Sequence, residues 1–202
     1  MNAASSQLHG IVRPLAPQRL SARADRAAIA LLGALLVREL DGTRVVARIV
    51  ETEAYREDDP ASHSHRGRTR RTAPMFASPG TAYVYRSYGV HWLLNVSVER
   101  DGVGAAVLLR AATVVEGLAA VRDRRPGARR DVELLRGPGR LTVGLAVDGP
   151  LRLASDDWEP EAAGIVAGPR VGISHAADLP WRFHLAGVAS VSPYRRSPRA
   201  PL

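Results

Sequence analysis

The sequence predicts an α+β domain built around a mostly antiparallel sheet. Strand-like stretches of alternating apolar and polar residues follow one another closely, and tight-turn dipeptides such as Asp41-Gly42 and Asp101-Gly102 separate them. The helical patterns are few and short, and no segment repeats. With 202 residues, 46% of them apolar, the chain is long enough for one packed domain.

From the N-terminus, we expect a flexible arm over residues 1–18, one domain over 19–193 and a flexible Pro- and Arg-rich tail over 194–202. Ser21 is a candidate N-cap for the first helix. Strands are expected at 35–40, 44–55, 81–87, 91–99, 105–112, 170–174 and 181–185. Helices are expected at 25–32, 116–124, 131–135 and from Arg140 onward, and loops at 56–80 and 148–165.

The composition excludes several kinds of chemistry. There is no cysteine, which rules out disulfides, thiolate nucleophiles and Cys-ligated metals. All 28 basic side chains are arginine, so no lysine can form a Schiff base. The net charge of +8 suits a polyanion such as DNA, RNA, a ribosome or anionic lipid, although genomic base composition also explains an arginine excess. Without a long apolar run, we expect a soluble, cytoplasmic protein.

The strand expected at 44–55 ends in acidic residues. Strict alternation places six of its residues on one face: Val45, Ala47, Ile49, Glu51, Glu53 and Tyr55. If that face is buried, at least one of the two glutamates lies at the mouth of a pocket, where it is a candidate general base. Solvated glutamates on an edge strand are the alternative.

The hairpin around Tyr88-Gly89 is rich in tyrosine. Tyr83 and Tyr85 share a strand face, and Tyr88 lies at the expected tip, where an aromatic ring could wedge between base pairs. A cross-strand aromatic pair with a half-buried surface tyrosine is the more common arrangement. Asn95 is disfavoured in the middle of a strand, so it either reads a base edge or has a structural role.

The loop at 56–80 combines histidines with arginines. His63 and His65 are too few for a convincing metal site, and a hydrogen bond from a histidine to a substrate is the better functional interpretation. Arginines that suit phosphate contacts follow them in the chain, namely Arg66, Arg68, Arg70 and Arg71. A solvated charge run is the alternative here, and it is our interpretation of the arginines in 122–130.

A series of motifs over residues 20–190 resembles the alkyladenine (3-methyladenine) DNA glycosylase family. The motifs are Arg48-Ile49-Val50-Glu51-Thr52-Glu53-Ala54-Tyr55, Pro60-Ala61-Ser62-His63-Ser64, Arg66-Gly67-Arg68-Thr69, Met75-Phe76, Pro79-Gly80, Tyr83-Val84-Tyr85, Tyr88-Gly89, Leu94-Asn95-Val96, Val107-Leu108-Leu109-Arg110-Ala111 and Gly137-Pro138-Gly139-Arg140-Leu141. They occur in family order with near-family spacing. The resemblance implies one α+β domain with a curved antiparallel sheet flanked by helices, similar to the formyltransferase C-terminal domain.

The resemblance also implies a role for each matching residue. Glu53 would activate water, Arg110 would position that carboxylate, and the backbone of Val171 would hold the water. The flipped base would lie between the rings of Tyr55 and Tyr85, with His63 touching its edge. Asn95 would collide with the 2-amino group of normal guanine and so exclude that base. Tyr88 would insert into the duplex as the wedge. Arg66, Arg68, Arg70 and Arg140 would contact the DNA backbone; the family commonly has lysine where Arg140 stands.

The expected activity is therefore base excision repair by a monofunctional glycosylase. It would release alkylated or deaminated purines such as 3-methyladenine, 7-methylguanine, hypoxanthine or ethenoadenine from double-stranded DNA. We expect no metal, no cofactor and no membrane partner, and a monomer that acts on the bacterial nucleoid. A lesion-binding protein without activity and a nucleoside hydrolase remain as alternatives.

Overall fold

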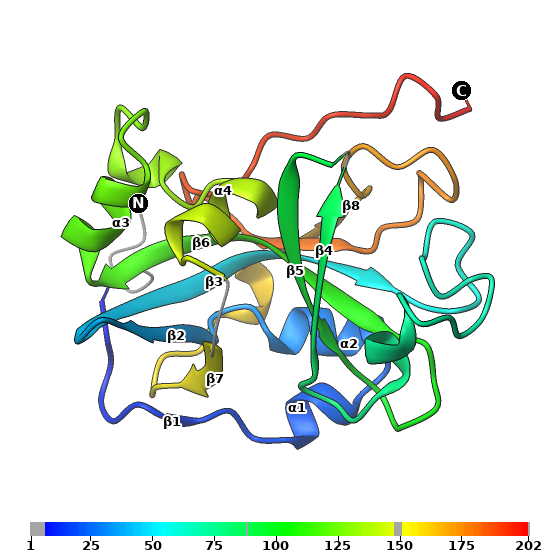
Figure 1. Ribbon diagram of the computed structural model, residues 1–202, viewed down its shortest axis with the longest axis horizontal. Coiled ribbons are helices and arrows are strands. Elements are labelled where there is room, and N and C mark those ends of the chain that lie inside the picture. Colours follow the sequence, from blue (N-terminus) through cyan, green and yellow to red (C-terminus); the bar gives the residue numbers. More distant parts are fainter. Residues whose placement is uncertain (1–6, 88, 148–150, 202) are drawn as a thin grey trace.

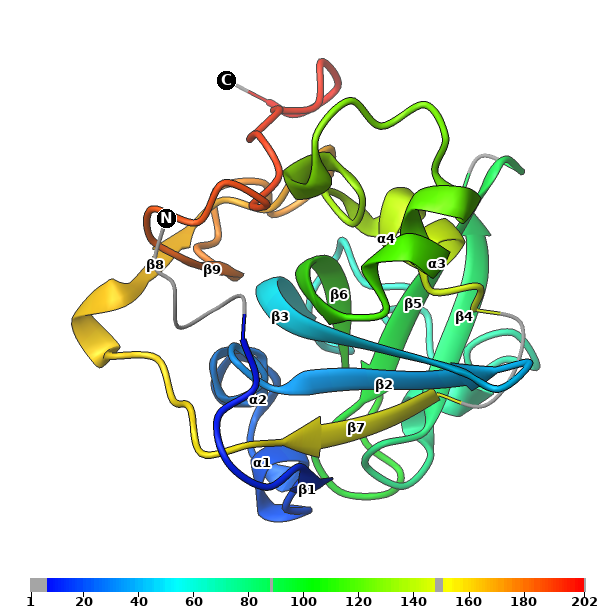
Figure 2. The same ribbon diagram turned by 90° about the vertical axis from the view of Figure 1, so that its left-hand side faces the viewer.

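The strands form one antiparallel sheet that curves into a half-barrel (Figures 1 and 2). The strands of the computed structural model are β1 (Arg13–Pro14), β2 (Leu35–Leu40), β3 (Thr43–Tyr55), β4 (Ala82–Ser87), β5 (His91–Ser97), β6 (Ala106–Glu116), β7 (Leu151–Ser155), β8 (Ile165–Gly168) and β9 (Arg182–Leu185). Their order is β1-β7-β2-β3-β6-β5-β4, and β9 pairs with both β3 and β8. The structure describes residues 7–87, 89–147 and 151–201. The predicted α+β class with a curved antiparallel sheet is confirmed.

The helices are short and cover the two sides of the half-barrel. They are α1 (Gln18–Ser21), α2 (Ala24–Ala30), α3 (Leu118–Arg124) and α4 (Pro138–Gly144), with 3-10 turns at Ala73–Phe76, Asp131–Glu133 and Ala162–Gly164. In Figure 1, α1 and α2 lie below the sheet, whereas α3 and α4 lie above it. Helix α2 buries Ala24, Ala27 and Ala28 in the core, because these small side chains let it pack closely against β3.

Strand β3 contains a bulge that changes which side chains share a face. Its register with β6 shifts between Ile49 and Glu51, which leaves Val50 as an extra residue. Ile49 and Val50 therefore both lie in the main core, and Thr52 follows them, donating a hydrogen bond to the Ala28 carbonyl of α2. The prediction that Glu51, Glu53 and Tyr55 continue the apolar face of Val45, Ala47 and Ile49 is wrong, because the bulge moves them to the opposite face.

Several predicted elements near the ends of the chain differ from the structure. Ser21 ends α1, and Arg23 stands at the N-cap of α2. Residues Leu151–Ser155 form β7, where the sequence predicts irregular chain. No strand occupies 170–174, since the N–H groups there bind the Glu53 side chain and the Arg195 carbonyl rather than a neighbouring strand.

The N-terminal segment lies against the sheet in its described part. Strand β1 pairs with β7, and Leu15 is buried in the core. Arg48 and Asp156 form a fully buried ion pair, and Arg48 also donates to the carbonyl of Gln7. The chain therefore packs against the domain from residue 7 onward, whereas the sequence predicts that the domain begins at residue 19. No helix in the described ranges is long and apolar enough to cross a membrane.

Candidate active site

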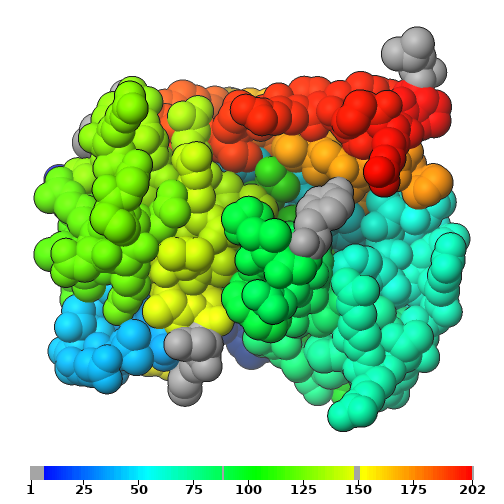
Figure 3. All heavy atoms as spheres, turned by 45° about the horizontal axis from the view of Figure 1, so that its top comes forward, coloured from blue at the N-terminus to red at the C-terminus, as the bar shows by residue number. Residues whose placement is uncertain are grey.

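A cavity of about 1030 Å³ opens where the ends of β3, β4, β5 and β6 meet the loops that follow β8 and precede α4. In Figure 3 the β4–β5 hairpin (green), the segment containing α3 and α4 (yellow-green) and the C-terminal segments (orange to red) come together on one face. The predicted site residues that line the cavity are Glu53, Tyr55, His63, Tyr85, Asn95, Arg110, Arg140 and Val171. The structure thus brings together residues that lie up to 118 positions apart in the sequence.

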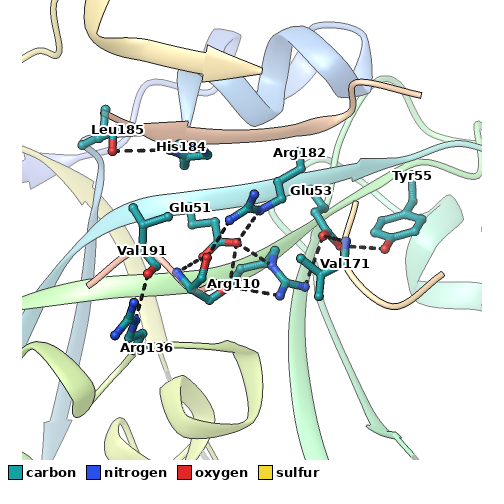
Figure 4. A network of polar contacts seen from close by, with 11 residues as sticks. Glu51, Glu53, Tyr55, Arg110, Arg136, Val171, Arg182, His184, Leu185 and Val191 are labelled. Carbon is teal, nitrogen blue, oxygen red and sulfur yellow. Dashed lines mark hydrogen bonds and ion pairs between the residues drawn. The ribbon is translucent and has the colours of Figure 1, made fainter. Parts of the chain in front are cut away.

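Glu53 is fully buried, and both of its carboxylate oxygens have partners (Figure 4). The Val171 N–H donates to Oε1 over 2.7 Å, and the Tyr55 hydroxyl donates to Oε2 over 2.7 Å. The Arg110 guanidinium lies 3.2 Å from Oε1. Burial raises the pKa of Tyr55 well above its ordinary value, and the Glu53 charge raises it further, so the phenol keeps its proton. These three contacts therefore hold the Glu53 carboxylate in one orientation at the cavity wall.

Arg110 lies between two carboxylates. Its Nε donates to Glu51 over 2.8 Å while Nη1 faces Glu53. Burial lowers the pKa of Arg110, but the charges of Glu53 and Glu51 raise it by more, so the guanidinium remains charged. Glu51 therefore belongs to the site without reaching the cavity, a role that strict alternation along the strand could not reveal.

Three aromatic side chains form one wall of the cavity. The rings of Tyr83 and Tyr85 stack with their centroids 5.4 Å apart, and the His63 ring meets Tyr85 edge-on at 4.6 Å. His63 Nδ1 lies 3.0 Å from the Tyr83 hydroxyl. Burial and the nearby Arg71 lower the pKa of His63, which favours the neutral imidazole near pH 7. Burial raises the pKa of Tyr85 to about 12. This wall therefore offers flat apolar faces without adding negative charge.

Tyr55 is supported from behind by Arg170, a residue that the sequence analysis did not single out. The Arg170 guanidinium lies 4.6 Å from the centroid of the Tyr55 ring and forms a fully buried ion pair with Asp59. It also donates to the Ala54 carbonyl over 2.9 Å. Because Arg170 directly precedes Val171, the same contacts fix the N–H that binds Glu53. The sequence gives no sign of this packing, because a single arginine after an acidic loop is usually exposed to solvent.

Asn95 has a structural partner as well as a place in the cavity wall. Its side chain is buried, and Nδ2 donates to the Tyr83 carbonyl over 3.1 Å. That hydrogen bond accounts for an asparagine in the middle of a strand and fixes the orientation of its amide. The hydrogen bond agrees with the structural interpretation of Asn95, and contact with a base edge stays a prediction.

The arginines divide into those at the cavity and those away from it. Five of them line the cavity without an ion pair to any described residue, namely Arg71, Arg86, Arg125, Arg136 and Arg140. Arg66, Arg68 and Arg70 are exposed on the loop and do not line the cavity. The expectation that 122–130 only meets solvent is wrong for Arg125, because the loop after α3 folds back towards the cavity.

The described residues do not include every predicted site residue. Tyr88 lies outside the described residues, so its role as a wedge stays a prediction. The neighbouring Val90 is 66% exposed at the hairpin tip. Within residues 7–87, 89–147 and 151–201, no group of three or more His, Asp or Glu side chains could hold a metal ion.

Comparison with known proteins identifies the family of this chain. The family model described as Methylpurine-DNA glycosylase matches residues 18–189. A protein of Nocardia farcinica is 51% identical over 193 residues, which cover 87% of this chain and 89% of the relative. A protein of Rhodococcus jostii is 48% identical, covering 87% and 83%. Each carries the name "Putative 3-methyladenine DNA glycosylase". The chain therefore belongs to the methylpurine-DNA glycosylase family and is a DNA glycosylase.

Proposed function

We propose that this enzyme hydrolyses the N-glycosidic bond of a damaged purine that has rotated out of duplex DNA into the cavity. The observation that carries the proposal is the buried Glu53 carboxylate at the cavity wall, held by the Val171 N–H and the Arg110 guanidinium. In the proposed mechanism, Glu53 orients a water molecule and accepts its proton as the water attacks the anomeric carbon.

The chemistry of the reaction favours an anion at this position. Cleavage of a glycosidic bond passes through a transition state that resembles an oxocarbenium ion, and a nearby carboxylate stabilises its positive charge. The chain has no lysine side chain that could attack the sugar, which favours water as the nucleophile and an abasic site in an intact strand as the product. A 3-methyladenine or 7-methylguanine base carries a positive charge and leaves readily, whereas hypoxanthine and ethenoadenine need more help from the site.

The aromatic wall supports recognition of a flat base. Tyr55 and Tyr85 both line the cavity, and a purine between them would gain stacking energy of roughly 1–3 kcal/mol per ring face. His63 would contact the edge of the base. Asn95, fixed by its bond to the Tyr83 carbonyl, would collide with the 2-amino group of normal guanine. Tyr88 would fill the gap left in the duplex, where unstacking costs a few kcal/mol.

Arginines around the cavity that form no ion pair with a described residue support duplex DNA as the substrate. Arg71, Arg86, Arg125, Arg136 and Arg140 bring five positive charges to its lining, and no described carboxylate neutralises them by an ion pair. Phosphate groups on both sides of a flipped nucleotide would supply the missing negative charge. Arg66, Arg68 and Arg70 would extend this contact along the backbone. The enzyme would act as a monomer in the bacterial cytoplasm.

An excision assay on a panel of duplexes tests the proposal. Each duplex carries one damaged purine and is incubated with excess enzyme, with and without EDTA. We expect free base release at an equal rate in both buffers, and strands that break only after alkali treatment. Lesion binding without release would instead indicate a binding protein, and release from free nucleosides alone would indicate a nucleoside hydrolase.

A further inference from the structure

Glu51 is a second buried carboxylate behind the proposed general base. Its side chain is fully buried, and it accepts hydrogen bonds from three residues of three different segments. Arg110 Nε of β6 lies 2.8 Å away, and Arg182 Nε of β9 lies 2.7 Å away. The N–H and the hydroxyl of Ser192 bond to it over 2.7 and 2.9 Å. Every hydrogen bond ends on a charged acceptor, and bonds of this kind are the strong ones.

Ser192 ties the C-terminal segment to the same network. Besides its two bonds to Glu51, its hydroxyl oxygen accepts from Arg110 Nη2 over 3.2 Å, and its carbonyl accepts from Arg182 Nη2 over 2.7 Å. The residue before it, Val191, accepts from Arg136 Nε over 2.9 Å (Figure 4). The C-terminal segment therefore contacts the Arg110 guanidinium on the side that faces away from Glu53.

This arrangement leaves Arg110 one orientation. Nε is held by Glu51 and Nη2 by Ser192, so Nη1 is the group directed at Glu53. A guanidinium is planar, and fixing two of its nitrogens also fixes the third. Two carboxylates and two guanidinium groups alternate in the network, so their formal charges balance. Burial raises the pKa of Glu51, but Arg110, Arg182 and the Ser192 N–H lower it by more, so Glu51 is ionised.

We propose that Glu51 and Ser192 are positioning residues that aim Arg110 at Glu53 and thereby set the rate of base release. Stability alone does not explain a charged network at this position, because well-packed apolar side chains in place of a buried ion pair are often equally stable. Geometry explains it, since a shift of about 1 Å at a catalytic group can cost roughly 100-fold in rate. This inference rests on the proposed function of Glu53.

Single-turnover base release by Glu51→Gln and Arg110→Gln variants, alone and combined, tests the inference. Glutamine keeps the shape of Glu51 but loses the charge that holds the guanidinium. We expect Glu51→Gln to release the base roughly 10- to 100-fold more slowly, while its Kd for lesion DNA stays within about twofold of the parent. Because Glu51 acts through Arg110, the double variant should be no slower than Arg110→Gln alone. Glu39→Gln, on an exposed strand end, is the matched control.

The outcomes are separable from those of the proposed function. If the parent enzyme releases no base, the proposed function fails before any variant is compared. If the parent is active and the two substitutions multiply in the double variant, Glu51 acts independently of Arg110 and the inference is overturned. An unchanged rate for Glu51→Gln overturns it equally.

A milder pair of variants covers the case in which Glu51→Gln does not fold. Ser192→Ala removes the hydroxyl that bridges Glu51 and Arg110 but keeps every charge and the Ser192 N–H. We expect it to slow base release several-fold, and we expect Ser192→Thr to restore the rate because threonine supplies the same hydroxyl. Equal rates for all three proteins would overturn the role of Ser192.

Discussion

Replacing Asp59 by alanine should destabilise the protein strongly, because it leaves the buried positive charge of Arg170 without its carboxylate partner. The side chains of Asp59 and Arg170 are both fully buried, and two nitrogens of Arg170 bond to the two carboxylate oxygens. Removing one partner of a buried pair typically costs about 3–5 kcal/mol. A whole domain is stable by only about 5–15 kcal/mol, so this single change would remove a large part of the total.

The expected shift is large enough to measure by thermal denaturation. For a chain of this size, each kcal/mol lowers the midpoint by roughly 2–4 °C, so Asp59→Ala should lower it by about 10 °C. Glu39→Ala, which breaks an exposed pair with Arg152, should change the free energy of unfolding by at most about 1 kcal/mol. Replacing both buried partners, as Asp59→Ala with Arg170→Met, should recover part of the loss, because no charge is then left unpaired.

The same substitution should also affect the site. Arg170 packs on Tyr55 and directly precedes Val171, so its displacement should slow base release at temperatures where the variant is still folded. If the midpoint of Asp59→Ala falls no further than that of Glu39→Ala, the pair is solvated in solution. That result would refute the role of a buried Asp59–Arg170 pair in supporting Tyr55.

Three further predictions concern pH, salt and specificity. The pKa of Glu51 is lowered in the folded state, so its contribution to stability is complete above the unfolded pKa near 4.5 and is lost as pH falls through the folded pKa. The difference in thermal midpoint between the parent and Glu51→Gln should therefore shrink on acidification from pH 6 to pH 3. A constant difference would contradict this. Arg125→Gln should lower the slope of log K against log salt for DNA binding by about one, whereas Arg152→Gln should leave it unchanged, because Arg152 of β7 is paired with Glu39 of β2 and does not line the cavity. Asn95→Ser should raise release of normal guanine by roughly tenfold or more in a base-release assay, and unchanged guanine exclusion would argue against a steric role.

The regular part of the fold was accessible from the sequence because local patterns decide it. The predicted strand at 35–40 coincides with β2, and the predicted strand at 44–55 differs from β3 by one residue. Alternating apolar residues and the Asp41-Gly42 turn are sufficient to specify this hairpin. Short strands are different. Strand β7 has only five residues next to an acidic segment, and its pairing with β1 and β2 provides the stability that its own sequence does not predict.

The site was predictable in its members but not in its geometry. Motif resemblance singled out Glu53 and Arg110, yet the bulge at Val50 decides which face of β3 Glu53 occupies. A bulge has no signature in alternation, since it is the point where alternation fails. The supporting residues Arg170 and Ser192 lie 117 and 139 positions from Glu53 along the chain. Only the packing of the C-terminal segments against β3 brings them to the site.

Single-turnover release of a damaged purine by Glu53→Gln is the most direct measurement of the central claim. Glutamine keeps the shape of the side chain and one oxygen, which can still accept from the Val171 N–H, but its NH2 group cannot accept from the Tyr55 hydroxyl and the amide cannot take a proton from water. We predict that lesion DNA still binds, while the rate of release falls roughly 100- to 10,000-fold. Release at the parent rate by this variant, with binding intact, would contradict the assignment of Glu53 as the general base.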